Sequence, residues 1–124
     1  MKIRVYYEDT DAGGIVYHSN YLNFCERARS QAFFDKRLMP YLDDGHFVAR
    51  KIVADYFRSA KLGDLLEVKT ELLEMKAASF TLKQTVYKEE EKLFELKILL
   101  AHISFEGVPK KIDKKTKELV LTLF

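Results

Sequence analysis

The stretch Ser-Asn-Tyr-Leu-Asn-Phe-Cys-Glu-Arg-Ala-Arg-Ser-Gln-Ala, residues 19–32, decides how the rest of the chain can fold. Its apolar and small side chains recur every three or four positions, the period of an amphipathic helix; they are Tyr21, Phe24, Cys25, Ala28 and Ala32. Ser19 or Asn20 can cap the start of this helix, and Pro40 bars its continuation. The helix would then be roughly 30 Å long, at about 1.5 Å per residue. Because Cys25, Ala28 and Ala32 are small, a sheet can approach the helix closely, so we expect the helix to be enclosed.

The segments on both sides of this helix alternate as strands do. Lys2 to Tyr7 places Ile3, Val5 and Tyr7 on one side, which predicts a half-buried first strand. An acidic loop, residues 8–14, follows and ends in a glycine pair that permits close backbone approach. After Gly45 the pattern predicts four successive strands at residues 47–58, 64–75, 79–88 and 92–105.

The short spacers 76–78 and 89–91 predict hairpins between antiparallel neighbours. The apolar face of the last strand changes side midway, which predicts a bulge near Ile98 to Ala101 and cover on both faces, one by the helix and the other by a partner subunit. Residues 113–121 could form a short closing helix. The order indicates an α+β domain in which an antiparallel sheet of about five strands wraps around one long central helix.

Length and composition limit the other possibilities. A chain of 124 residues fits one domain, residues 1–124, and 48% hydrophobic with 32% charged residues excludes a disordered protein. It has no apolar run of transmembrane length, and 21 basic against 19 acidic residues argue against a nucleic-acid partner. The N-terminus shows no apolar signal core, and the single Cys25 excludes an internal disulfide. We therefore expect a cytoplasmic protein.

The segment before the helix holds the parts of an acyl-transfer site. A helix N-terminus carries free N–H groups and a partial positive charge, which can hold a carbonyl oxygen as it becomes an oxyanion. The acidic loop can place Asp11 beside that carbonyl as nucleophile or general base. No Ser-His-Asp arrangement or G-x-S-x-G elbow is present. A thioester needs less activation than an amide, because its thiolate leaves readily, so one carboxylate could suffice.

Residues 7–21, Tyr-Glu-Asp-Thr-Asp-Ala-Gly-Gly-Ile-Val-Tyr-His-Ser-Asn-Tyr, resemble the signature of the YbgC-type thioesterases, the Tol-Pal-associated branch of the 4-hydroxybenzoyl-CoA thioesterase family. Glu-Arg-Ala-Arg at 26–29 continues the match, and residues 58–64 are similar to the family's third-strand approach. The resemblance implies the hotdog fold and hydrolysis of acyl-CoA without an organic cofactor. It makes Asp11 the active-site aspartate, places the backbone N–H near His18 at the thioester carbonyl, and lets Tyr7 and the His18 side chain line the pocket. It also implies a homodimer, joined edge to edge through its sheets, that assembles into a homotetramer.

Four further residues are candidate substrate contacts, and several plainer interpretations remain open. Gly14 permits close backbone approach, and the turn that carries Arg58, Ser59 and Lys61 could meet the phosphates of CoA. Asp11 could instead form a turn, His18 could be a polar residue near a cap, and Tyr7 could be core. The remaining expectations are that Glu8, Asp9 and Glu26 are solvated, that Cys25 is core, and that His46 and His102 are too isolated to bind a metal.

Two other functions compete with hydrolysis. One is a non-hydrolytic module that binds acyl-CoA or acyl carrier protein and works with phospholipid-synthesis or envelope proteins. The other is a hotdog dehydratase that acts on hydroxyacyl thioesters and needs a histidine and an acidic residue paired across its site. The intact Asp11 favours hydrolysis over the first, and the helix-start signature argues against the second.

Overall fold

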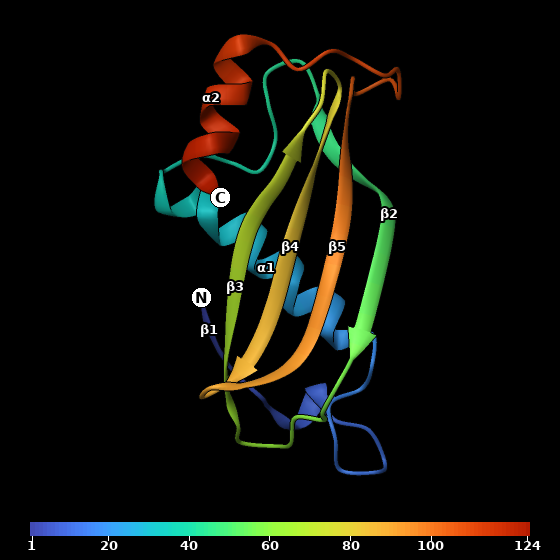
Figure 1. Cartoon of the computed structure of the whole chain (residues 1–124), viewed down its shortest axis with the longest axis vertical. Helices are drawn as coiled ribbons and strands as arrows, with labels where there is room; N and C mark the ends of the chain where they lie inside the picture. The colour runs from blue at the N-terminus through green and yellow to red at the C-terminus, as the bar shows by residue number, and fades with distance from the viewer.

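The computed structural model describes residues 1–124 and shows one five-stranded antiparallel sheet with two helices (Figure 1). In chain order the elements are β1 (Lys2–Arg4), a 3₁₀ turn η1 (Tyr7–Asp9), α1 (Asn20–Asp35), β2 (His46–Tyr56), β3 (Leu65–Met75), β4 (Ser79–Lys88), β5 (Glu91–Ile103) and α2 (Lys114–Leu123). The strand order across the sheet is β1-β3-β4-β5-β2. The α+β architecture and the hotdog fold expected from the sequence are confirmed.

Both predicted hairpins form, and they make up the centre of the sheet. β3 pairs with β4, with Thr70 opposite Gln84, and β4 pairs with β5, with Gln84 opposite Leu96. The short β1 lies on one edge beside β3, and the long β2 lies on the other edge beside β5. The sheet therefore presents β2 as a long free edge.

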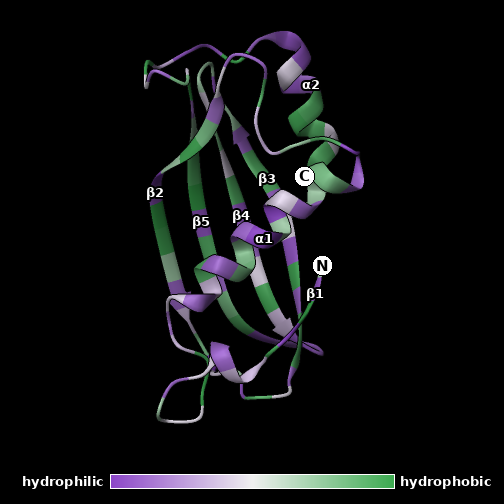
Figure 2. Ribbon diagram, turned by 180° about the vertical axis from the view of Figure 1, so that it is seen from behind, coloured by the Kyte–Doolittle hydropathy of each residue, from purple (hydrophilic) through white to green (hydrophobic).

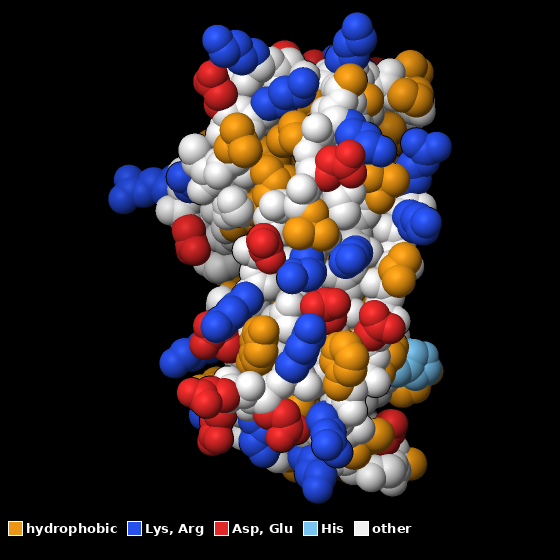
Figure 3. All heavy atoms as spheres, viewed as in Figure 1, with side chains coloured by type: hydrophobic (Ala, Val, Ile, Leu, Met, Phe, Trp, Pro, Cys, Tyr) orange, Lys and Arg blue, Asp and Glu red, His pale blue; other side chains and the backbone are white.

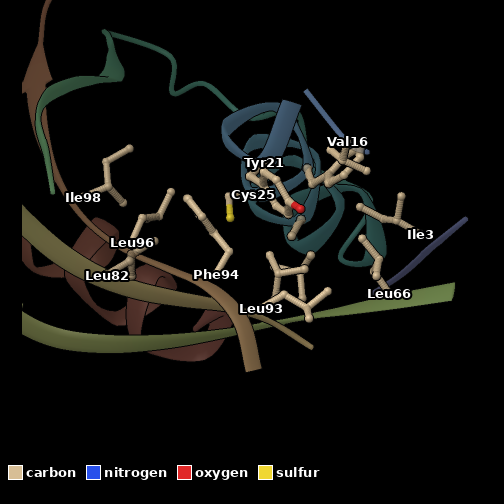
Figure 4. Packing of buried hydrophobic residues seen from close by; sticks show 14 of the residues in the cluster. Ile3, Val16, Tyr21, Cys25, Leu66, Leu82, Leu93, Phe94, Leu96 and Ile98 are labelled. Atoms are coloured by element: carbon tan, nitrogen blue, oxygen red, sulfur yellow. The ribbon is translucent and has the colours of Figure 1, made fainter. Parts of the chain in front are cut away.

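Helix α1 lies across one face of the sheet, where it packs against β3 and β4 (Figure 2). The helix face turned to the sheet carries buried Tyr21, Phe24, Cys25 and Ala28. In Figure 4, Cys25 faces Phe94 of β5 within the hydrophobic cluster that joins helix and sheet. The predicted stripe of small side chains is the contact surface, and it allows the close approach expected from the sequence.

Both ends of α1 differ from the prediction. The helix ends at Asp35, because the N–H groups of Lys36 and Leu38 both donate to Phe33 O and Arg37 takes a left-handed φ of 59°. It is therefore about 24 Å long at about 1.5 Å per residue. The helix ends five residues before Pro40, so the proline is not what terminates it. At the start, neither the Ser19 nor the Asn20 side chain caps the helix by accepting a backbone N–H.

The bulge lies on a neighbouring strand and not on β5. Ala49 pairs with Leu100 and Lys51 with Leu99, which leaves Arg50 of β2 as the extra residue. From Phe94 to His102, β5 keeps one inward parity, and every second residue is buried. The apolar residues of opposite parity, Leu99, Ala101 and Ile103, are half-buried. The bulge predicted near Ile98 to Ala101 therefore lies at the expected level of the sheet, but on β2 and not on β5.

The two faces of the sheet differ in character. The face opposite α1 carries interspersed lysine, glutamate and apolar side chains (Figure 3), including ion pairs between Lys83 and Glu71 and between Lys92 and Glu95. On the α1 side the helix covers little of β2, and Ile52 and Tyr56 are 41% and 48% exposed. Neither helix has the length and apolar character needed to cross a lipid bilayer.

Candidate active site

A pocket of about 240 Å³ opens between the N-terminal end of α1 and the C-terminal end of β2. It is lined by Asp11, Ile15, Val16, His18, Tyr21, Tyr56, Phe57, Arg58 and Ser59. Four residues selected from the sequence, Asp11, His18, Arg58 and Ser59, therefore meet although 48 positions separate the first from the last. Tyr7, Gly14 and Lys61 do not line this pocket.

A tight turn holds Asp11 at the pocket wall. Its Oδ1 accepts a hydrogen bond from the Gly13 N–H at 2.8 Å, and its carbonyl oxygen accepts from the Gly14 N–H at 3.0 Å. Gly14 closes the turn with a φ of +78°, a conformation that favours glycine. Asp11 thus forms the turn that one interpretation expected, since one oxygen accepts from the Gly13 N–H, and the exposed residue also lines the cavity.

A buried residue, Asp9, ties this turn to the helix. The residue is 7% exposed, and its Oδ2 accepts from the Tyr6 N–H at 2.8 Å. Its carbonyl oxygen accepts from both the Tyr17 N–H and the Asn20 Nδ2, each at 2.9 Å. The expectation that Asp9 is solvated was wrong. The three-residue spacing between Tyr6 and Asp9, which is that of a capping box, was the signal that could have revealed it.

Three backbone N–H groups at the start of α1, those of His18, Ser19 and Tyr21, have no acceptor within the chain. The N–H groups of Tyr17 and Asn20, by contrast, bind Asp9 O and Tyr17 O. Free N–H groups at a helix start are the donors that an oxyanion requires. The predicted electrophile binder is therefore available beside Asp11.

Tyr56 of β2 fixes the His18 peptide from the opposite wall. Its Oη donates to His18 O at 2.8 Å, and its ring contacts Tyr21 and Phe94 with centroids 5.7 Å and 4.9 Å away. Sequence reasoning missed Tyr56, because it lies 38 residues from His18 on a strand whose place at this pocket only the sheet order determines. Tyr21 completes the wall. Its Oη accepts from the buried Ala60 N–H at 3.0 Å, and burial raises the pKa of its hydroxyl.

These features agree with three comparisons with known proteins. Residues 13–95 match the family model of the thioesterase superfamily. The chain belongs to that superfamily. It is 42% identical to the acyl-CoA thioesterase YbgC of Helicobacter pylori, over 97% of this chain and 98% of that protein. It is also 42% identical to the acyl-CoA thioester hydrolase YbgC of Escherichia coli, over 73% of this chain and 70% of that protein. A solved probable thioesterase from Bartonella henselae superposes with a TM-score of 0.85 at 32% identity, covering 91% of this chain and 97% of that one.

The remaining candidates lie around the pocket of this superfamily member. Tyr7, in the η1 turn, is 83% exposed, so the alternative that it is core was wrong. Lys61 lines a neighbouring hollow with Lys88 and Glu89, and its backbone N–H donates to Asp64 Oδ2 at 2.9 Å. Gly14 lies on the exposed turn beside Asp11.

Two interpretations of α1 residues are confirmed. Cys25 has no exposed surface, and burial raises the pKa of its thiol to about 12, so it is a core residue and not a nucleophile. Glu26 is exposed, as expected. No three His, Cys, Asp or Glu side chains lie close enough together to hold a metal ion.

Proposed function

We propose that this protein hydrolyses acyl-CoA to a free acid and CoA, with Asp11 as its catalytic carboxylate. The observation that carries the proposal is that one pocket is lined by Asp11 and by His18, whose backbone N–H has no acceptor in the chain. The names of the YbgC relatives, acyl-CoA thioesterase and acyl-CoA thioester hydrolase, support the same substrate class. They also favour hydrolysis over the alternative of a non-hydrolytic binding module.

The geometry supports a mechanism in two parts. The thioester oxygen accepts hydrogen bonds from the free N–H groups at the start of α1, which stabilise the negative charge that develops there. Asp11 then acts by one of two routes. It attacks the carbonyl carbon, forming an acyl–aspartyl anhydride as the C–S bond breaks and CoA thiolate leaves, and water hydrolyses the anhydride. Otherwise it removes a proton from a water molecule that attacks the same carbon.

The other pocket residues have supporting roles in this proposal. The His18 side chain offers a hydrogen bond to the substrate or to the attacking water, and Tyr56 holds the His18 peptide in place through its 2.8 Å bond. Arg58 and Ser59 lie at the pocket wall beside exposed surface, where they would contact CoA. Gly14, Lys61 and Tyr7 lie outside the pocket of one protomer, so their roles require a longer substrate or a second subunit. The proposal needs no organic cofactor or metal.

A second copy of the chain fits the free edge of the sheet. The backbone groups of β2 on the side away from β5 have no strand partner, and Val53 and Phe57 are each 51% exposed. An unpaired edge of this length is usually covered in native proteins. We therefore include in the proposal a homodimer joined through β2, assembling to a homotetramer, with acyl carrier protein or phospholipid-synthesis proteins as further partners and a cytoplasmic location.

The test is the substitution Asp11→Asn, which removes the charge of the side chain with little change in its size. We expect Asp11→Asn to lower kcat about 10²- to 10⁴-fold, the usual range for a lost acid–base group. Thiol release from short, long and aromatic acyl-CoAs measures this rate, and mass spectrometry identifies the acid. Glu8→Gln, which removes an exposed charge from the same loop, is the matched control and should keep the wild-type rate. Asp11→Asn turning over at the wild-type rate would contradict the mechanism. Conversion of a 3-hydroxyacyl thioester to its unsaturated product would instead indicate a dehydratase.

A further inference from the structure

A second cavity of about 180 Å³ opens toward the other end of α1, between the helix, the start of β2 and the C-terminus. It is lined by Glu26, Arg29, Ser30, Phe33, Pro40, Phe47, Ala49, Phe80, Leu100 and Phe124. It shares no residue with the Asp11 pocket. Phenylalanine rings from four different segments form much of its wall, and the aromatic pairs Phe47–Phe80 and Phe33–Phe124 pack against each other. The cavity therefore combines an apolar wall with the polar side chains of Glu26, Arg29 and Ser30 from α1.

Arg29 places a partly buried cation in this wall, and it forms no ion pair, although Glu26 lies three residues earlier on α1 and lines the same cavity. Its one hydrogen bond runs from Nη1 to Gln84 Oε1 at 2.8 Å. Burial lowers the pKa of the guanidinium, but arginine stays protonated at neutral pH. A buried cation without a counter-ion is costly, so native proteins usually pair it with an anion.

Gln84 holds Arg29 in this position. It has no exposed surface, and its Nε2 donates to Cys25 O at 2.9 Å and to Thr70 Oγ1 at 3.1 Å. These two bonds fix the amide so that only Oε1 faces the guanidinium. Arg29 thus binds a neutral acceptor on one side, and its remaining N–H groups keep no acceptor in the chain. A fixed guanidinium of this kind suits a carboxylate, which it can bind through two parallel hydrogen bonds.

We propose that this cavity is a binding site for an aliphatic carboxylic acid, with the carboxylate on Arg29 and the alkyl chain against the phenylalanine rings. A free carboxylic acid is also the product of the proposed hydrolysis. The choice of an aliphatic acid as ligand rests on that proposed function, whereas the carboxylate site itself is inferred from Arg29 and the phenylalanine rings. Glu26 lies on the rim and is exposed, so solvent screens its repulsion of the bound carboxylate.

Calorimetric titration of the full-length Asp11→Asn variant with octanoate and with octanol tests this site without any turnover. We expect octanoate to bind at least about tenfold more tightly than octanol, as a charge-assisted carboxylate contact predicts. Affinity should rise about fourfold for each added methylene until the cavity is full. Adding Arg29→Gln should remove the preference for octanoate, and Arg29→Lys should keep part of it. Arg27→Gln, an exposed arginine on the same helix, is the matched control and should change nothing.

Three results would overturn the proposal. The first is equal octanoate affinity with and without Arg29→Gln, provided that circular dichroism shows both variants folded. The second is loss of octanoate binding in His18→Ala, which would place the acid in the catalytic pocket. The third is a change of oligomer mass in Arg29→Gln with unchanged octanoate binding, which would assign the counter-ion to a second copy of the chain. If octanoate binds as expected while wild-type protein releases no thiol, the site stands and the proposed hydrolysis fails.

Discussion

The hydrogen bond from Asn20 to the Asp9 carbonyl gives a direct way to loosen the catalytic loop without touching a pocket side chain. Asn20 Nδ2 donates to Asp9 O at 2.9 Å, and its Oδ1 accepts from Asn23 Nδ2 at 3.1 Å. Asn20→Asp keeps the shape of the side chain but replaces the donor with a carboxylate oxygen. The variant therefore loses the link from helix to loop and places two oxygens in repulsion, while Asn23 can still donate to residue 20.

The expected loss of stability follows from these contacts. A net hydrogen bond contributes about 0.5–1.5 kcal/mol, and the new repulsion adds to its loss. A negative charge in the first turn of a helix recovers about 0.3–1 kcal/mol. Asn23→Asp, one turn further along α1, gains part of the helix-dipole term and loses only its own exposed hydrogen bond to Asn20 Oδ1. It leaves the Asp9 link intact, so it is the matched control. Relative to that control we expect Asn20→Asp to lower the free energy of unfolding by about 1–2 kcal/mol, or Tm by about 4–8 °C.

The catalytic effect should be larger than the effect on stability. Asp11 lies two residues from Asp9, and a misplacement of a reacting group by about 1 Å can cost about 10² in rate. We expect kcat of Asn20→Asp to fall about 10- to 100-fold with little change in KM, because the loss lies in positioning and not in ground-state binding. Thermal unfolding and thiol-release kinetics on both variants measure the two effects. Equal kcat and equal Tm for Asn20→Asp and Asn23→Asp would refute the role given to this link.

Two further predictions concern the pocket wall and the core. Tyr56→Phe removes the hydroxyl that donates to His18 O but keeps the ring against its neighbours; thiol-release assays should show kcat reduced about tenfold, and an unchanged kcat would remove Tyr56 from the site. Cys25, with a thiol pKa of about 12, has a thiolate fraction of about 10⁻⁴ at pH 8 and no exposed surface. Mass spectrometry should therefore find it unmodified by iodoacetamide at pH 8 until denaturant unfolds the chain, and rapid alkylation of native protein would contradict its burial.

The local patterns of the chain were sufficient to predict the elements. Strand β4 was predicted at residues 79–88 and forms over the same residues, because Phe80, Leu82, Gln84 and Val86 alternate without interruption. Asp113 was predicted to open the last helix, and its Oδ1 accepts from the Thr116 N–H at 2.7 Å. Each of these features depends on residues within one turn or one hairpin of each other, so the printed sequence contains the whole interaction.

The predictions that were wrong concern features that depend on contacts between distant parts of the chain. The position of the bulge depends on residues that are distant in the chain. Arg50 is the extra residue of β2 because of the register in which β2 pairs with β5. The first strand stops at Arg4 because the chain must turn to bring Asp9 beneath the helix, and this turn exposes Tyr7. Alternation in a short segment cannot reveal a turn that is stabilised by a contact eleven residues away.

The sequence by itself determined the helix with its small-residue stripe, the four long strands, and the acidic glycine turn that carries Asp11. Local propensity and periodicity suffice for these features, because each is a property of neighbouring residues. Only the tertiary structure decided that Tyr56 reaches the His18 carbonyl, that Asp9 is buried, and that Arg29 lies partly buried in a cavity wall and forms no ion pair. Those facts depend on sheet order and on burial, which bring together residues that are distant in the chain.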